Sequence, residues 1–221
     1  TTSAPLNIKL EHWEITNARI VYEDAVSKTS VVMNGFNHFG NGKIAEIYEV
    51  NIKTSIDDLS LVLDGEPYYS KSKFDSDIST EIDLENMKFV LKDNMLQLNA
   101  FVFGFDGWLE MVEEDINMDL TFGVKENTFR NILSLVPGIF MEGFDDIKTD
   151  GVLGFDGFAK GTYNEASVPA FGMNLTVKDA MFQYPDLPTA ISNINVDLNI
   201  DNPNNHINEL GINLRNFHLD M

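Results

Sequence analysis

The chain has 221 residues, of which 43% are hydrophobic and 23% charged, and its formal net charge is −20. This is the composition of a globular chain that can bury a core, and not of a disordered one. Because nucleic acids and anionic lipid surfaces attract clustered Lys and Arg, the acidic balance argues against nucleic acid as a partner and against electrostatic docking on membranes. The absence of cysteine excludes disulfides and thiolate zinc sites.

From the N-terminus, the first patterned element is an eight-residue phrase from Asn17 to Asp24. Its eight positions are, in order, a polar residue, a small residue or Met, any residue, Ile or Phe, any residue, Tyr or Leu, any residue, and Asp. The same pattern recurs at 86–93 and 179–186. Each copy predicts a strand whose final Asp closes a turn. Three copies in one short chain suggest a repetitive sheet, which grows along one dimension and exposes long surfaces.

Asn-Gly and Asp-Gly pairs predict tight hairpin turns, because these residues tolerate the positive φ that two-residue turns require. The stretches 104–107 and 154–157 are both Gly-Phe-Asp-Gly, and we interpret each as a hairpin turn with an aromatic anchor. The candidate pairs begin at Asn34, Asn41, Asp64, Asp106, Asp150 and Asp156.

Apolar and polar residues alternate strictly over several runs, of which Ile116 to Val124 and Ile194 to Ile200 are the clearest. A period of two predicts half-buried antiparallel strands. Two stretches deviate. Ala100 to Phe105 is apolar at successive positions, which predicts burial on both sides, and the phase slips near Arg215, which predicts a β-bulge.

One segment has helical spacing instead. Asn127 and Thr128 could cap a helix, apolar residues follow at i, i+3, i+4 and i+7, and Pro137-Gly138 would end it. We expect an amphipathic helix of about three turns near 127–137 that covers an end or edge of the sheet.

Together these elements predict a mainly β fold, a repetitive and twisted antiparallel sheet curved into a groove or half-barrel. We expect a single elongated β-rich region over residues 1–221, with a candidate boundary between two subdomains near 126–150. Because the chain starts at Thr1 and stops inside a patterned stretch, we expect it to be a fragment of a longer protein. The alternative is a β-sandwich or barrel that covers its own apolar face.

Motifs for catalysis and metal binding are weak. Asp75-Ser76-Asp77 and Asp145-Asp146 are candidate calcium ligands, but neither continues into an EF-hand loop. The four histidines lack the spacing of a metal pair, and neither a phosphate-binding loop nor a nucleophile elbow is present. Trp13 and Trp108 could form a sugar platform or be buried. We expect no enzymatic activity, no cofactor and no metal.

The chain resembles the AsmA family of bacterial envelope proteins. The resemblance is carried by the phrase from Asn17 to Asp24, by Leu133 to Gly138, and by Leu175 to Pro203, which matches "strand, Tyr-Pro-x-Leu-Pro, strand, Asn-Pro". It implies a periplasmic part of a protein anchored in the inner membrane, similar to TamB and chorein-type bridge proteins. It also implies a β-groove used in outer-membrane biogenesis and in phospholipid transfer.

Our leading hypothesis is therefore a non-enzymatic fragment whose apolar sheet face forms a groove for phospholipid acyl chains. Membrane contact would come from parts of the parent protein outside this chain. The alternatives are an assembly module for outer-membrane proteins and a secreted carbohydrate-binding β-sandwich. The candidate groove-lining residues are Ile116, Met118, Leu120, Phe122, Leu175, Val177, Ile194, Val196 and Leu198.

Overall fold

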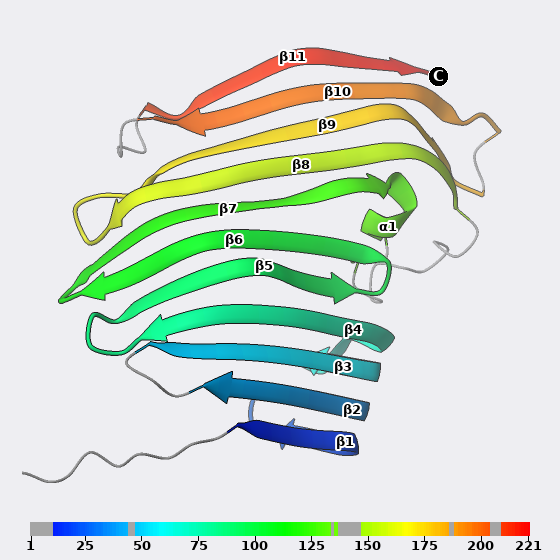
Figure 1. Ribbon diagram of the computed structural model, residues 1–221. Coiled ribbons are helices and arrows are strands. Elements are labelled where there is room, and N and C mark those ends of the chain that lie inside the picture. Colours follow the sequence, from blue (N-terminus) through cyan, green and yellow to red (C-terminus); the bar gives the residue numbers. More distant parts are fainter. Residues whose placement is uncertain (1–10, 44–46, 134, 137–146, 186–187, 204–208) are drawn as a thin grey trace, which may run out of the picture.

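The computed structural model describes residues 11–43, 47–133, 135–136, 147–185, 188–203 and 209–221 (Figure 1). The described residues form one antiparallel sheet of 11 strands, in which each strand pairs with its neighbours in the chain. The strands are β1 His12–Asp24, β2 Thr29–Lys43, β3 Tyr48–Leu63, β4 Glu66–Asp83, β5 Lys88–Leu98, β6 Phe101–Val112, β7 Asp115–Thr128, β8 Lys148–Tyr163, β9 Ala170–Gln183, β10 Ile191–Asn202 and β11 Gly211–Asp220.

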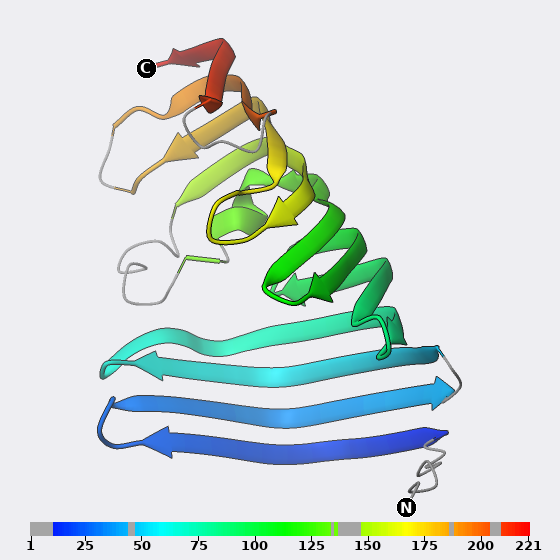
Figure 2. The ribbon, with the colours of Figure 1, turned by 90° about the vertical axis from the view of Figure 1, so that its left-hand side faces the viewer.

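The sheet twists along its length, and its middle strands bend. In Figure 2, β1 to β4 run across the view, whereas the strands that follow turn away and hook back. Twist of this kind follows from the preferred geometry of strands of L-amino acids. β1 and β11 are the two edges of the order, so the sheet does not close into a barrel. The predicted mainly β fold with a curved antiparallel sheet is confirmed.

The two faces of the sheet differ in chemistry because every strand alternates. Cross-strand partners lie on the same face of a sheet. One face, which we call the apolar face, can thus be followed through successive pairs from Ile20↔Met33 in β1 and β2 to Leu198↔Leu214 in β10 and β11. The described residues form no second sheet over this face, so it is not covered as in a sandwich. Most apolar residues are accordingly only half-buried.

The helix is shorter than expected. α1 spans Phe129–Leu133, and the Thr128 hydroxyl accepts a hydrogen bond from the Asn131 N–H at 3.3 Å, which confirms Thr128 as a cap. Asn127 instead pairs with Leu153 in the ladder of β7 and β8, so strand pairing takes the residues where the helix was expected to begin. Leu135 and Val136 already form a turn, and Pro137-Gly138 lies outside the described residues.

Most of the predicted hairpin turns are wrong. Asp64-Gly65 forms the turn between β3 and β4, but the five other pairs lie inside strands, and so do both Gly-Phe-Asp-Gly stretches. Several of these glycines allow a close approach between neighbouring strands instead. A Cβ on Gly151 would lie 2.3 Å from the Ala180 Cα atom, and one on Gly107 would lie 2.0 Å from the Asp119 carbonyl oxygen. Such contacts are a known reason for glycine in strand interiors.

The repeated phrase has two outcomes. Asp24 closes a turn as predicted, because its carboxylate accepts the N–H groups of Val26 and Ser27. The corresponding Asp93 lies inside β5 with a φ of 51°, so the turn predicted there is wrong. Asp186 in the third copy lies outside the described residues. The first residues of two copies, Asn17 and Asp179, also have positive φ at points where the register shifts.

Of the two deviations from alternation, one is confirmed. The register of β10 and β11 shifts between Asp197 and Leu198, which places the predicted bulge at Arg215. Burial of the stretch from Ala100 to Phe105 on both sides is wrong. Ala100 is exposed in a turn, and 101–105 are half-buried, because no second layer lies over either face in the described part of the chain.

β7 and β8 pair directly, so the sheet continues across the connection at 126–150. Within the described residues, no helix has the length and apolar character needed to cross a bilayer.

Candidate apolar groove

The nine predicted lining residues lie on three strands and share the apolar face. Ile116, Met118, Leu120 and Phe122 alternate along β7 and pair with positions of β8. On the other side of β8, Leu175 pairs with Leu198, and Val177 pairs with Val196. Ile194 is opposite Ala180, which is fully buried. The structure therefore brings the nine together on one surface, with β8 between the two groups.

Aromatic rings form the centre of this surface, and of these only Phe122 is among the nine residues predicted from the sequence. The Phe103 ring centroid lies 6.1 to 6.2 Å from those of Phe105, Phe122 and Phe155, which come from β6, β7 and β8. Ring pairs at this separation add to the stability that area burial alone provides. The signal was present in the two Gly-Phe-Asp-Gly stretches, which supply Phe105 and Phe155, but it was interpreted as turns.

A pocket of about 440 Å³ opens on the apolar face, next to the aromatic centre. Its lining belongs to β2 to β6 and exposes only apolar surface. Beside it, the Tyr69 hydroxyl donates a hydrogen bond of 3.2 Å to the Leu135 carbonyl, so Leu135 lies against β4. The pocket-lining residues used below are Leu59, Leu61, Tyr69, Phe74, Leu96 and Phe103.

Polar side chains on the apolar face are few, and three of them form a row. His38 pairs with Thr54, and Thr54 pairs with Ser76, across β2, β3 and β4. His38 Nδ1 and Thr54 Oγ1 lie 3.0 Å apart in a hydrogen bond, and Phe36 stacks on the His38 ring at 5.9 Å. We call His38, Thr54 and Ser76 the polar row. Away from strand ends, the described pairs of the apolar face contain no Asp, Glu, Lys or Arg.

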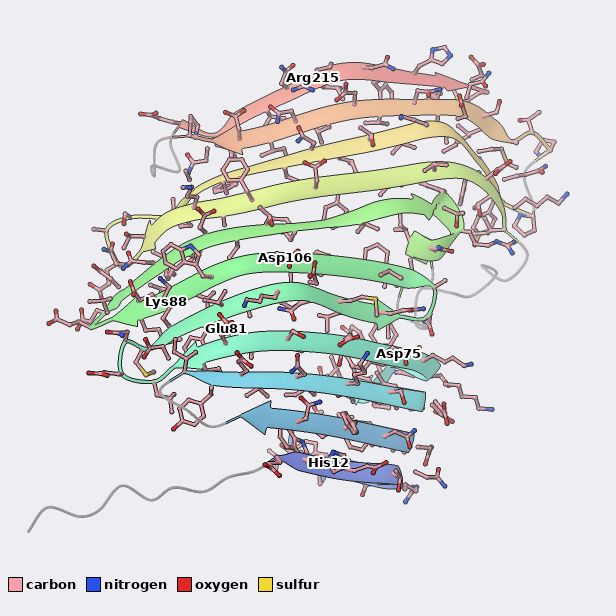
Figure 3. The ribbon with its side chains drawn as sticks, viewed as in Figure 1. His12, Asp75, Glu81, Lys88, Asp106 and Arg215 are labelled. Carbon is pink, nitrogen blue, oxygen red and sulfur yellow. The ribbon has the colours of Figure 1, made fainter. Side chains whose placement is uncertain are left out.

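The opposite face carries the charge, and Asp75, Glu81 and Asp106 belong to it (Figure 3). Cross-strand ion pairs join Lys53 to Asp77 and Lys160 to Asp119, each at 2.6 Å, and Lys92 pairs with Glu81. These pairs are half-exposed and contribute little each. Trp108 also lies there, with the Lys88 ammonium 4.6 Å from its ring centroid.

The calcium candidates gain no support from this face. Asp77 is bound to Lys53, and Asp145-Asp146 lies outside the described residues. Among the residues that the structure describes, no group of three His, Cys, Asp or Glu side chains could hold a metal ion.

Two aspartates at hairpin turns have perturbed acidity. Hydrogen bonds from Asn86 hold the pKa of Asp83 below its usual range, with the larger effect from the Asn86 side chain and the smaller from its backbone N–H. The backbone N–H of Val26 and then the side chain of Ser27 lower the pKa of Asp24. Both aspartates accept hydrogen bonds that stabilise hairpin turns at strand ends.

No family model, curated protein or solved structure matches this chain. The function must therefore be argued from the apolar face itself.

Proposed function

We propose that this chain is a non-enzymatic lipid-holding module whose apolar face receives phospholipid acyl chains and lets them move along the sheet. The observation that carries the proposal is the continuous apolar face, which crosses all 11 strands and has no second sheet over it in the described residues. Large uncovered apolar surfaces on soluble chains usually serve binding.

The physical basis is burial without direction. Removing apolar surface from water contributes about 25 cal/mol of stabilising free energy per Å², whatever the orientation of the acyl chain that covers it. The half-buried side chains of β7, β9 and β10 offer such surface at successive strands. Because neighbouring strands lie roughly 4.8 Å apart, an acyl chain lying across them meets similar contacts at each step. Uniform contacts favour sliding over capture at one point.

The charge distribution suits the same role. Ionised groups on the opposite face keep the sheet solvated, whereas the described pairs of the apolar face contain no ionised side chain away from strand ends to interrupt the path of a hydrocarbon chain. The resemblance to AsmA proteins supports placing this module in the periplasm, between the inner and outer membranes. In that setting the parent protein would supply the inner-membrane anchor.

Photo-crosslinking from the two faces tests the proposal. A photoreactive residue at Leu120, on the apolar face, should capture phospholipid from cells, whereas the same residue at the adjacent Thr121, on the exposed opposite face, should not. Leu120→Glu should abolish lipid co-purification, and Thr121→Glu should leave it unchanged. Equal capture from both positions, or none from Leu120, would refute a lipid-holding face.

A second function is favoured by the edge strand β11. Ile212, Leu214 and Phe217 are 67%, 55% and 61% exposed, and the strand contains neither Lys nor Pro. Edge strands that expose apolar side chains can pair with another strand. An assembly module would use this edge to guide strands of outer-membrane proteins. Crosslinks from Asn213 to barrel proteins, with no lipid captured at Leu120, would favour this function over the first.

A further inference from the structure

The polar row lies on the apolar face beside the 440 Å³ pocket. Ser76 is next but one to Phe74 along β4, and it pairs with Leu96 on β5. Phe74 and Leu96 both line the 440 Å³ pocket. The row therefore begins at the rim of the pocket and runs away from it across β3 to β2.

From this juxtaposition we infer that the polar row binds the ester region of a diacyl amphiphile while one of its chains occupies the pocket. This inference rests on the proposed function and assigns a fixed position within the groove to the polar end of the chains. The occupant is an uncharged, hydrogen-bond-accepting group attached to hydrocarbon, as in a glycerol ester.

The pocket fits the hydrocarbon part. Its exposed lining is entirely apolar, and its volume of about 440 Å³ lies within the range of ordinary small-ligand sites. Tyr69 uses its hydroxyl on the Leu135 carbonyl, so this polar atom is already bonded. A hydrocarbon chain end in the pocket therefore contacts only apolar surface.

The row fits the ester part. A hydroxyl donates one hydrogen bond, and a neutral imidazole has one donor and one acceptor nitrogen. When Thr54 donates to Nδ1 of His38, the proton of the ring is on Nε2, which has no partner among the described residues. The Ser76 hydroxyl likewise has no hydrogen-bond partner among the described residues. Two donors then face the groove, and carbonyl oxygens of an ester can accept from both.

Charge decides against an ionised ligand group at this point. The described pairs of the apolar face hold no Lys or Arg away from strand ends, and the chain as a whole has a net charge of −20. A carboxylate or phosphate placed on the row would leave water without a cation to compensate it. The charged headgroup of a phospholipid would thus stay in solvent, with its ester at the row.

The test compares an ester lipid with its ether analogue, which has the same chains and headgroup but no carbonyl. The whole chain is incubated with vesicles of diacyl phosphatidylcholine or of dialkyl ether phosphatidylcholine, and bound lipid is counted by native mass spectrometry. Loss of one or two net hydrogen bonds of ordinary strength corresponds to about a five- to thirtyfold weaker affinity for the ether.

A row variant with His38→Phe, Thr54→Val and Ser76→Ala should bind both lipids equally. Thr80→Val is the matched control, because Thr80 lies on the same face of β4, four residues from Ser76 on the side away from Phe74. It should keep the preference for the ester. Circular dichroism and urea unfolding test whether both variants fold. If the row variant does not fold, single substitutions at Ser76 and Thr54 replace it.

The outcomes separate this inference from the proposed function. If the wild-type chain binds ester and ether lipids equally, the row does not recognise esters, although the groove still holds lipid. Retention of the ester preference by the row variant would overturn the assignment in the same way. If neither lipid binds, the lipid-holding function itself fails.

Discussion

At the scale of single residues, amide and carboxylate side chains hold the irregular points of the strands. Asn37 accepts the N–H of Asn17 at 2.9 Å, and Asn195 accepts that of Asp179 at 3.2 Å, in both cases across neighbouring strands. Asn94, which is 2% exposed, accepts the N–H of Ser79 at 2.6 Å. A bulge leaves a backbone donor without its ladder partner, and these side chains replace it.

Asp83 makes stability depend on acid pH. Asn86 donates to its carboxylate from the backbone at 3.0 Å and from the side chain at 2.7 Å, and these bonds lower its pKa. Because the folded pKa is depressed, the stabilisation is present above the unfolded pKa and is lost as pH falls through the folded one, below about pH 4. Asp83→Asn should therefore lower stability at pH 7 and flatten its decline between about pH 5 and 2.

Urea midpoints measured across this pH range check the Asp83 prediction. Asp64→Asn provides the control, because it removes the same charge in the turn between β3 and β4. If stability falls as steeply with decreasing pH in Asp83→Asn as it does in Asp64→Asn, the Asp83 turn is not the source of the pH dependence.

At the scale of elements, glycines decide how closely neighbouring strands approach. Gly104 and Gly107 stand three residues apart in β6 and come from the same Gly-Phe-Asp-Gly stretch. Gly107 has a φ of 124° and would place a Cβ 2.0 Å from a backbone oxygen of β7. The nearest atom to a Cβ on Gly104 is 3.7 Å away, which is an ordinary contact.

Gly107→Ala should destabilise the chain by about 3 kcal/mol or more, because backbone cannot move aside as a side chain can and because φ is unsuited to alanine. Gly104→Ala should change the free energy of unfolding by less than about 1 kcal/mol. Urea unfolding followed by circular dichroism measures both. Similar losses for the two variants would contradict the close approach of β6 and β7.

The elements also show where sequence patterns fail. The alternation of Ile116 to Val124 predicted β7 well, because alternation is imposed by water on one face and apolar contact on the other. The turns predicted at Asp106-Gly107 and Asp156-Gly157 are wrong. An Asp-Gly pair looks the same in the sequence whether its glycine provides a turn or leaves room for a neighbouring strand. The helix was too long in prediction because pairing with β8 holds Asn127 in a strand.

At the scale of the whole molecule, the sheet is a linear array in which each inner strand has two neighbours and each edge strand has one. Stability in such arrays is roughly a sum of nearest-neighbour terms, so the ends should open most easily. Amide hydrogen exchange should be fastest in β1 and β11 and slowest in β5 to β7. The exposed pattern of β11, set against the half-buried pattern of β9, leads to the same expectation.

Hydrogen exchange with mass spectrometry resolves this gradient by peptide. β9 and β11 make a matched comparison, because both are antiparallel strands and both have β10 as a neighbour. Uniform protection over all strands would contradict the linear array and would indicate that both edges are covered in solution.

The sequence by itself determined the two-faced strands, the bulge at Arg215 and the cap at Thr128, because each depends on local alternation or on a neighbouring backbone group. It also placed Leu120, Val177 and Val196 on the apolar side of their strands. Only the tertiary structure decided that no second sheet covers the apolar face in the described part of the chain, that Phe103 meets Phe122 and Phe155, and that His38, Thr54 and Ser76 form one row. These depend on the register between strands and on the course of the whole sheet, which residues far apart in the chain set together.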